Sequence, residues 1–251
     1  MRYASLGSGS RGNATLVESA TTCVMIDCGF NHKQTLLRLE RLGKKPADIT
    51  AICLTHEHGD HIAGVKLFSK RYGTPVYMTQ GTANALEDIQ SSVLINAGDV
   101  LDFGELEITS VAVSHDAAEP CQYVIRENHQ RLGLLTDIGY ACEAVLNAYQ
   151  DCDAMILEAN YDNALLDSGP YPESVKARIA GDRGHLSNEQ SLALVKALQF
   201  ENVHALAIAH VSEKNNHRET ITSLFRQHFG KDVEKMDFVC QQRGMPWRTL
   251  A

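Results

Sequence analysis

The chain has 251 residues, of which 44% are hydrophobic and 22% charged, and its formal net charge is −8. This composition is typical of a soluble globular protein, and the length suits one α/β domain over residues 1–251. The sequence lacks an apolar run of about eighteen residues and an apolar leader, so we expect a cytoplasmic protein without a membrane span. The negative charge argues against a broad, salt-dependent grip on nucleic acid, but bound metal ions can still make one cleft locally positive.

The cysteine pattern predicts reduced thiols. The seven cysteines are odd in number and include no C-x-x-C pair. This pattern favours single cysteines in packing positions over a disulfide framework or a zinc ribbon.

The first predicted elements are short strands around a glycine-rich loop. Residues 3–6 and 15–18 predict two strands, and the loop between them, residues 7–13, has three glycines and two serines. Its plainest interpretation is a hairpin turn, and the alternative is a donor-rich edge of a substrate cleft. Residues 22–26 predict a further strand that ends at Asp27. A carboxylate at a strand end can orient a metal-binding histidine.

The densest chemical signal is Thr-His-Glu-His-Gly-Asp-His at residues 55–61, directly after the apolar residues 51–54. Residues two apart in an extended backbone face the same way, so His56 and His58 can reach one metal ion together. Asp60 and the histidine that follows it fall at the turn into a helix, where Asp is a favoured cap, and can face a second ion. The pattern therefore predicts the floor of a two-metal hydrolytic site.

Several later strands also end in a potential ligand or proton donor. Residues 82–89 predict a short helix, and residues 93–113 are β-rich. The strands predicted at residues 108–113, 132–136, 154–157 and 205–209 are followed by His115, Asp137, Glu158 and His210. Sites at the carboxyl ends of strands are usual in layered α/β folds. The repetition of this arrangement favours a functional interpretation.

A further histidine precedes a well-marked helix start. In Gly-His-Leu-Ser-Asn-Glu-Gln at residues 184–190, Ser187 and Gln190 have the spacing of a capping box, which predicts a defined position for His185. The basic segment before it, residues 167–183, has two interpretations. It is either a mobile flap over the cleft or a plain surface loop and helix.

The motif H-x-H-x-D-H at residues 56–61, followed by the later strand-end residues, resembles the metallo-β-lactamase superfamily. The resemblance implies an α/β fold, a four-layer αββα sandwich, with two divalent ions such as Zn²⁺, Mn²⁺ or Fe. It assigns His56, His58 and His115 to the first metal, Asp60, His61 and His210 to the second, Asp137 to a bridge between them, and Asp27 to a supporting role.

Within the superfamily, Gly-His-Leu-Ser is similar to a tRNase Z segment whose histidine acts in proton transfer, which implies that role for His185. The wider set of motifs resembles the YycJ/WalJ group, regarded as bacterial exonucleases that act on DNA. The short interval between Asp137 and His210 leaves no room for the clamp domain of RNase J-like enzymes, and no tRNase Z arm is apparent.

The expected reaction is metal-dependent phosphodiester hydrolysis at a DNA end. Asp60 would orient the attacking water, His185 would protonate the leaving oxygen, and Glu158 would hold the His185 imidazole. The candidate phosphate contacts are Ser8, Ser10, Asn13, Arg178, Arg183, Asn215 and Asn216. The alternatives are a small phosphodiester, a thioester, ester or lactam as substrate, or a metal-bound scaffold without turnover. The oligomeric state stays open.

Overall fold

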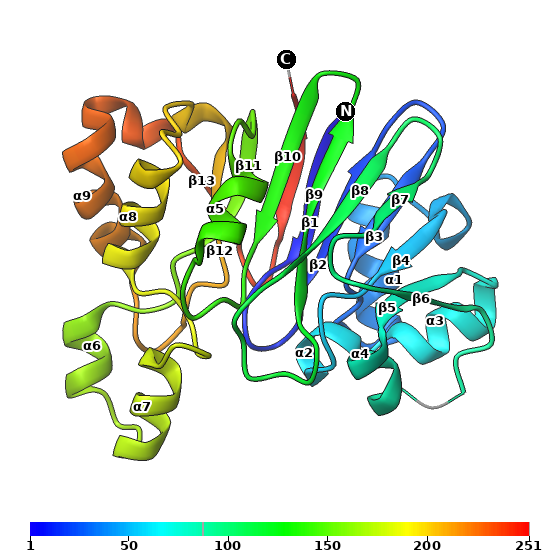
Figure 1. Cartoon of the computed structure of the whole chain (residues 1–251), viewed down its shortest axis with the longest axis horizontal. Helices are drawn as coiled ribbons and strands as arrows, with labels where there is room; N and C mark the ends of the chain where they lie inside the picture. The colour runs from blue at the N-terminus through cyan, green and yellow to red at the C-terminus, as the bar shows by residue number, and fades with distance from the viewer. Residues whose placement is uncertain (87, 251) are drawn as a thin grey trace. The chain divides into compact units, whose positions relative to one another are not determined.

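The computed structural model describes residues 1–86 and 88–250 (Figure 1). The chain divides into two compact units. The first unit contains Met1–Ala112, Ala117–Gln130 and Val239–Ala251, and the second contains Val113–Asp116 and Arg131–Phe238. The single domain expected over residues 1–251 stays a prediction, and each unit is described separately below.

The first unit is built on a seven-stranded sheet with the strand order β14-β1-β2-β3-β4-β5-β6. Its strands are β1 (Arg2–Gly7), β2 (Ala14–Glu18), β3 (Cys23–Ile26), β4 (Ala51–Cys53), β5 (Val76–Thr79), β6 (Ser92–Ile95) and β14 (Met245–Thr249). Strand β1 is antiparallel to β14 and β2, and β2 is antiparallel to β3, which confirms the predicted hairpin. Strands β3 to β6 are parallel, so β3 and β4 end at the same edge.

The first unit also contains an antiparallel group, β7 (Val100–Asp102), β8 (Glu107–Ala112) and β9 (Cys121–Glu127). Tight turns precede and join β7 and β8. The amide of Asp99 donates to the carbonyl of Asn96 at 3.1 Å before β7, and the amide of Gly104, with φ +81°, donates to the Asp102 side chain at 2.7 Å between the two strands. The β-rich pattern predicted for residues 93–113 is therefore confirmed.

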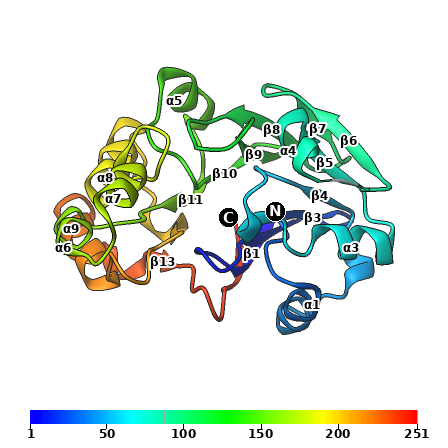
Figure 2. The ribbon, with the colours of Figure 1, turned by 90° about the horizontal axis from the view of Figure 1, so that it is seen from below.

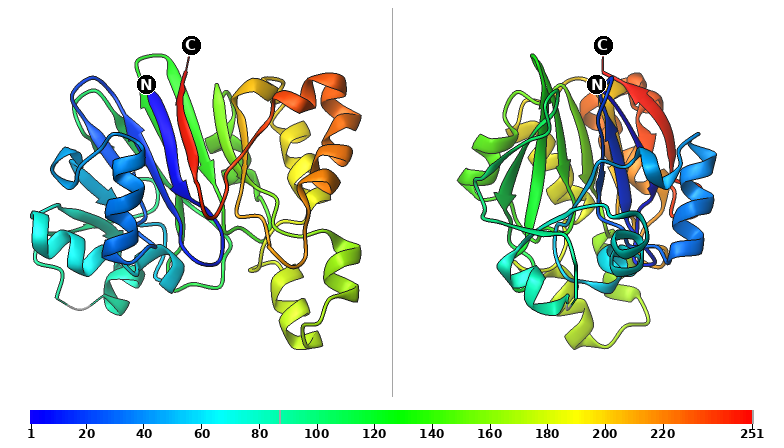
Figure 3. Two further views of the ribbon diagram at one scale, coloured as in Figure 1. Left: turned by 180° about the vertical axis from the view of Figure 1, so that it is seen from behind. Right: turned by 90° about the vertical axis from the view of Figure 1, so that its right-hand side faces the viewer.

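Helices α1 (His32–Arg41), α2 (Gly59–Ile62), α3 (Val65–Tyr72) and α4 (Gln80–Ala85), with the 3₁₀ turn η1 (Pro46–Asp48), complete this unit. Helix α1 lies against one face of the sheet (Figure 3), and its Leu39 joins the buried core around Leu16, Met25 and Ile52. The Asn31 side chain caps α1 by accepting a hydrogen bond from the amide of Gln34.

The helix predicted at residues 82–89 is misplaced by a few residues. Helix α4 begins at Gln80 because the Thr79 side chain accepts a hydrogen bond from the amide of Thr82, and it ends at Ala85. Thr79 is both the last residue of β5 and the cap of α4, so the helix follows the strand without a loop. Residue 87 lies outside the described residues.

The second unit contains a parallel group of strands, β10 (Gln130–Leu135), β11 (Ala154–Glu158), β12 (Leu206–Ala209) and β13 (Asp237–Phe238). Its helices are α5 (Glu143–Tyr149), α6 (Asn163–Ser168), α7 (Glu173–Ala180), α8 (Asn188–Ala197) and α9 (Arg218–Phe229), with 3₁₀ turns η2 (Val203–Ala205) and η3 (Gly230–Lys235). Helices α8 and α9 lie side by side (Figures 1 and 2). Because β10, β11 and β12 run parallel, the residues that follow them emerge at one edge.

The segment interpreted as either a flap or a surface loop and helix, residues 167–183, contains the end of α6 and all of α7 (Figure 1). The amide of His185 donates to the carbonyl of Ile179 at 2.8 Å, and the amide of Gly184 donates to the carbonyl of Gly181 at 2.8 Å. This regular structure agrees with the loop-and-helix interpretation.

The predicted capping box is present at the start of α8. The Ser187 side chain accepts from the amide of Gln190 at 3.2 Å, and the Gln190 side chain accepts from the amide of Ser187 at 2.8 Å. We expect Ser187→Ala to lower the free energy of unfolding by about 1 kcal/mol, because the amide of Gln190 at the helix start loses its hydrogen-bond acceptor. Urea unfolding followed by circular dichroism measures the change. Ser92→Ala, at an exposed position in β6, is the matched control, and an equal loss there would contradict the capping role.

Candidate functional site

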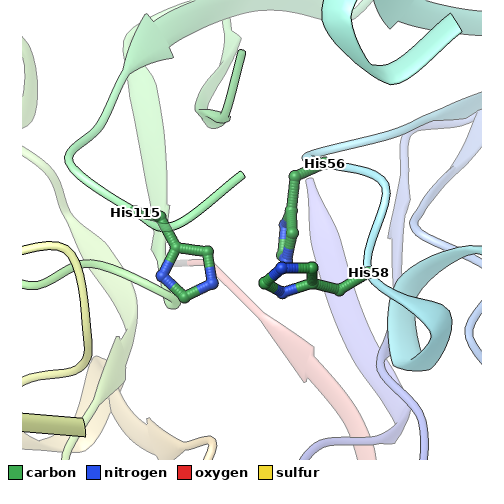
Figure 4. Close-up of side chains that lie close together, drawn as sticks. All are labelled: His56, His58 and His115. Atoms are coloured by element: carbon green, nitrogen blue, oxygen red, sulfur yellow. The ribbon is translucent and has the colours of Figure 1, made fainter. Parts of the chain in front are cut away.

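The histidine-rich turn of the first unit follows β4 directly. The His56 and His58 rings lie edge to face with centroids 4.5 Å apart (Figure 4), and the His56 and His61 centroids are 4.1 Å apart. The expectation that Asp60 caps the helix is wrong, because α2 begins at Gly59 and His58 holds the cap position. Asp60 instead lies in the first turn, where its charge suits the helix dipole.

Asp27 supports this turn from the end of β3, as the sequence predicted. Its Oδ2 lies 2.8 Å from His61 Nδ1, and its Oδ1 accepts from the amide of Thr55 at 2.9 Å. Burial raises the pKa of Asp27, while the neighbouring His61 and the hydrogen bonds from Thr55 act in the opposite direction. The contact places the ring proton of His61 on Nδ1, so Nε2 carries the lone pair that a metal ion requires.

The second unit gathers the residues predicted after β10, β11 and β12. His210 Nε2 lies 3.3 Å from Asp137 Oδ1, and His185 Nδ1 lies 2.6 Å from Glu158 Oε1. Asp137 and His210 both have positive φ angles, 53° and 49°. Residues other than glycine adopt this backbone region at a cost, and such strain concentrates at functional sites.

Glu158 and His185 form a hydrogen-bonded pair in which Glu158 is buried and His185 is partly exposed. Burial by itself raises the pKa of Glu158, but the attraction of His185 and hydrogen bonds from His185 and His210 outweigh it, so the net pKa is lowered. Burial lowers the pKa of His185, and Glu158 more than reverses this effect, so that pKa is raised. Glu158 is fully buried, and its Oε2 also accepts from the amide of Ile138 at 3.2 Å. The pair therefore favours the protonated form of His185 and fixes its ring.

His115 is held in the form that binds metal. Its Nδ1 donates to the carbonyl of Gly184 at 3.0 Å, and its Nε2 lies 3.9 Å from Asp137 Oδ1. Burial lowers the pKa of His115, although Asp137 partly opposes this, so the ring is neutral. Neutral imidazole is the state that coordinates a metal ion.

The donor chemistry fits divalent metal ions. In the second unit, Asp137, His185 and His210 each offer a ligand atom, and these atoms all lie within 4.8 Å of one another. The predicted ligands of the first unit offer the same imidazole and carboxylate donors. Nitrogen and oxygen donors of this kind suit Zn²⁺, Mn²⁺ and Fe, and they do not distinguish these ions.

The predicted phosphate contacts differ in exposure. Ser10, Arg178 and Arg183 are exposed, whereas Ser8, Asn13, Asn215 and Asn216 are buried. Arg178 pairs with Asp116, and Arg183 Nε donates to the carbonyl of His115 at 3.2 Å. Substrate contact stays an untested prediction for all seven residues, and the burial of four of them favours a supporting role.

Two buried asparagines of this set have partners within their own units. Ser8 Oγ donates to Asn13 Oδ1 at 2.9 Å. Asn216 and Asn188 exchange two amide hydrogen bonds, at 2.7 Å and 3.0 Å, and thereby join the start of α8 to the segment after β12.

Sequence reasoning missed Asn160. Its amide donates to the carbonyl of His210 at 2.8 Å and lies 3.1 Å from His210 Nδ1. The available signal was its place two residues after Glu158 at the end of β11, at the edge where the other polar residues emerge. Sequence reasoning likewise gave no role to Thr55, whose amide donates to Asp27.

The sequence of this chain matches a known protein family. The family model described as "Beta-lactamase superfamily domain" matches residues 22–210. The chain belongs to this superfamily. It is 35% identical over 226 residues to the exodeoxyribonuclease YycJ of Bacillus anthracis, which covers 87% of this chain and 85% of that protein. It is 34% identical to the exodeoxyribonuclease WalJ of Streptococcus pneumoniae, with 87% and 84% covered.

The solved structures agree on the fold. The metallo-β-lactamase fold protein YhfI of Bacillus subtilis superposes with a TM-score of 0.71 at 16% identity, with 94% of each chain covered. The predicted metallo-β-lactamase fold and resemblance are confirmed, and the chain is a metal-dependent hydrolase of the YycJ/WalJ group. None of the helices in residues 1–86 and 88–250 is long and apolar enough to cross a membrane.

We expect Asp27→Asn to weaken zinc binding by roughly 10- to 100-fold, because the carboxylate that orients His61 becomes a neutral amide. Competition with a chromophoric chelator measures the affinity. Asp88→Asn removes an exposed carboxylate that pairs with Lys66 in the same unit and is the matched control. Wild-type affinity in Asp27→Asn would show that Asp27 has only a structural role.

Proposed function

We propose that this protein is a two-metal phosphodiesterase that removes nucleotides from DNA ends. The observation that carries the proposal is the contact between buried Glu158 and partly exposed His185, 2.6 Å apart, whose imidazole also lies 4.0 Å from Asp137. A protonated, oriented imidazole beside a candidate metal ligand is what a phosphodiesterase needs to protonate an alkoxide leaving group. The relatives named as exodeoxyribonucleases support nucleic acid as the substrate class.

The proposed metal ligands follow the superfamily pattern and the donor chemistry of each unit. His56, His58, Asp60 and His61 belong to the first unit, and His115, Asp137 and His210 belong to the second. When bound, two divalent ions acidify a water molecule and stabilise the negative charge that develops on the phosphoryl oxygens.

The side chains then have separate tasks. Asp60 orients the attacking water through its carboxylate. His185 carries a proton that it can deliver to the leaving oxygen, and Glu158 holds the opposite ring nitrogen so that the imidazole does not rotate. Ile138 contributes by donating its amide to Glu158, which fixes the carboxylate in turn.

The surface chemistry favours a short contact with the substrate. Ser10, Arg178 and Arg183 are the exposed candidates for phosphate contact, and Arg178 would exchange Asp116 for a phosphate oxygen. With a net charge of −8 and 6% aromatic residues, the chain lacks the basic track and stacking platform that hold a long strand. A short footprint suits trimming from an end and gives a shallow dependence of affinity on salt.

We expect His185→Ala to lower kcat by roughly 10²- to 10⁴-fold on a DNA phosphodiester, because the leaving alkoxide then lacks a proton donor. The loss should be much smaller for bis-p-nitrophenyl phosphate, whose leaving group needs no proton. Glu158→Gln should show the same pattern with a smaller loss. Equal losses of His185→Ala on both substrates, or a loss of bound metal, would assign His185 to metal or substrate binding.

We expect Mn²⁺-loaded protein to degrade a linear single strand of DNA and to leave a circular strand of the same sequence intact, because the circle has no end. Gel electrophoresis of both substrates over time measures this. Equal degradation of the circle would contradict the exonuclease assignment. Inertness toward both strands, with turnover of a small phosphodiester, a thioester or a β-lactam, would identify the corresponding alternative substrate.

A further inference from the structure

The glycine-rich loop at residues 7–13 is anchored by a residue from the other end of the chain. The Gln241 side chain is 9% exposed, and both of its polar atoms are used on the loop. Its Oε1 accepts from the amide of Arg11 at 2.8 Å, and its Nε2 donates to the carbonyl of Gly12 at 2.9 Å. A single amide group thus holds two consecutive residues of the loop.

The loop approaches Gln241 too closely for a side chain. Gly9 has φ +138°, and a Cβ added to it would lie 2.8 Å from Gln241 Oε1. The backbone of Gln241 is fixed in turn by Arg38, which donates to its carbonyl at 3.1 Å and to that of Leu6 at 2.6 Å. The Arg38 guanidinium also lies over the Phe30 ring at 3.9 Å. Gln241 is therefore itself held in place, as a rigid support must be.

The loop determines the orientation of the Asn13 amide. Asn13 Oδ1 accepts from the amide of Gly9 at 2.8 Å and from Ser8 Oγ at 2.9 Å. A backbone N–H can only donate, so Asn13 Oδ1 must face the Gly9 amide, and Asn13 Nδ2 donates in turn to the Gly9 carbonyl at 3.1 Å. The loop thus uses one of the two Nδ2 protons and fixes the direction of the other.

The remaining Nδ2 proton can be donated to the carboxylate of Asp60, a candidate metal ligand. Asn13 Nδ2 lies 3.2 Å from Asp60 Oδ2 and 3.1 Å from His61 Nε2. The backbone makes the same connection, because the amide of Asn13 donates to the carbonyl of Asp60 at 2.8 Å and the carbonyl of Asn13 accepts from Gly29 at 2.9 Å. Asn13 therefore fixes both the backbone and the carboxylate of Asp60.

We propose that Asn13 and Gln241 are positioning residues for the metal ligand Asp60. Gln241 holds the loop, the loop orients Asn13, and the Asn13 amide directs the Asp60 carboxylate. This inference rests on the ligand assignment in the proposed function. Both residues lie outside residues 22–210, the part of the chain that the family model matches. A ligand fixed before the ion arrives loses less rotamer freedom on binding, so the support increases metal affinity.

A purely structural role for Gln241 makes a different prediction. If Gln241 only closes the hairpin, its loss lowers thermal stability and leaves the affinity of the folded protein for metal unchanged. If it positions Asp60, its loss lowers metal affinity at temperatures where the protein is fully folded. Zinc affinity measured well below the melting temperature separates the two roles.

The experiment uses the full chain and Zn²⁺ alone, in competition with a chromophoric chelator. We expect Asn13→Ala and Gln241→Ala to weaken zinc binding by roughly 10- to 100-fold, the range for partners that orient metal ligands. Gln241→Met fills a similar volume without hydrogen-bonding groups and tests the same loss if the Ala variant fails to fold. Gln242 is an exposed glutamine next to Gln241, so Gln242→Ala is the matched control and should bind zinc with wild-type affinity. Val76→Ala, a cavity in the buried strand β5, should lose thermal stability but keep zinc affinity.

The double variant provides the decisive measurement. Because Gln241 acts through Asn13, Asn13→Ala with Gln241→Ala should bind zinc no more weakly than Asn13→Ala alone. Losses that add, or wild-type affinity in folded Gln241→Ala or Gln241→Met, would overturn the inference while leaving the proposed function intact. Failure of the wild-type protein to bind zinc or Mn²⁺ would instead overturn the ligand assignment on which both depend.

Discussion

Each unit of the protein holds a histidine ring by a hydrogen bond between Nδ1 and a buried carboxylate. Asp27 holds His61 at 2.8 Å in the first unit, and Glu158 holds His185 at 2.6 Å in the second. A buried carboxylate is costly unless it is paired and hydrogen-bonded, and both carboxylates also accept a backbone amide, from Thr55 and Ile138 respectively. The same bond therefore stabilises the buried charge and fixes the ring tautomer on which metal binding or proton transfer depends.

Three polar residues at strand ends adopt a left-handed backbone conformation, which costs energy. Asp27, Asp137 and His210 follow β3, β10 and β12, and their φ angles are 60°, 53° and 49°. A left-handed residue turns the chain sharply out of the sheet, so the side chain leaves the strand at its very end. Hydrogen bonding nearby compensates for the strain, as the bond from Asn160 to the carbonyl of His210 illustrates at 2.8 Å.

Charge on this chain is arranged locally and not as a broad surface. The exposed Arg178 is paired with Asp116, the residue directly after His115, and the net charge is −8. A protein of this charge has little long-range attraction for a polyanion. This agrees with the proposed recognition of a chain end, where one or two phosphates would be in contact.

The sequence by itself predicted most of the strands, the capping box at Ser187 and the polar residues at strand ends, because apolar runs, cap spacing and dense donor residues are local patterns. It did not predict β9, β13 or β14. It also indicated that Asp27 supports a metal-binding histidine, and the structure identifies that histidine as His61. It misplaced the start of α4 and the cap of α2. The exact ends of a helix depend on which side chains and amides form hydrogen bonds in the folded chain, and several nearby residues can do so. The contacts of Gln241 with residues 11 and 12, and of Asn13 with Asp60, came only from the tertiary structure. Such long-range hydrogen bonds leave no periodic signal, since an asparagine or glutamine in a loop suits solvent and a buried partner equally well until the fold brings the partner close.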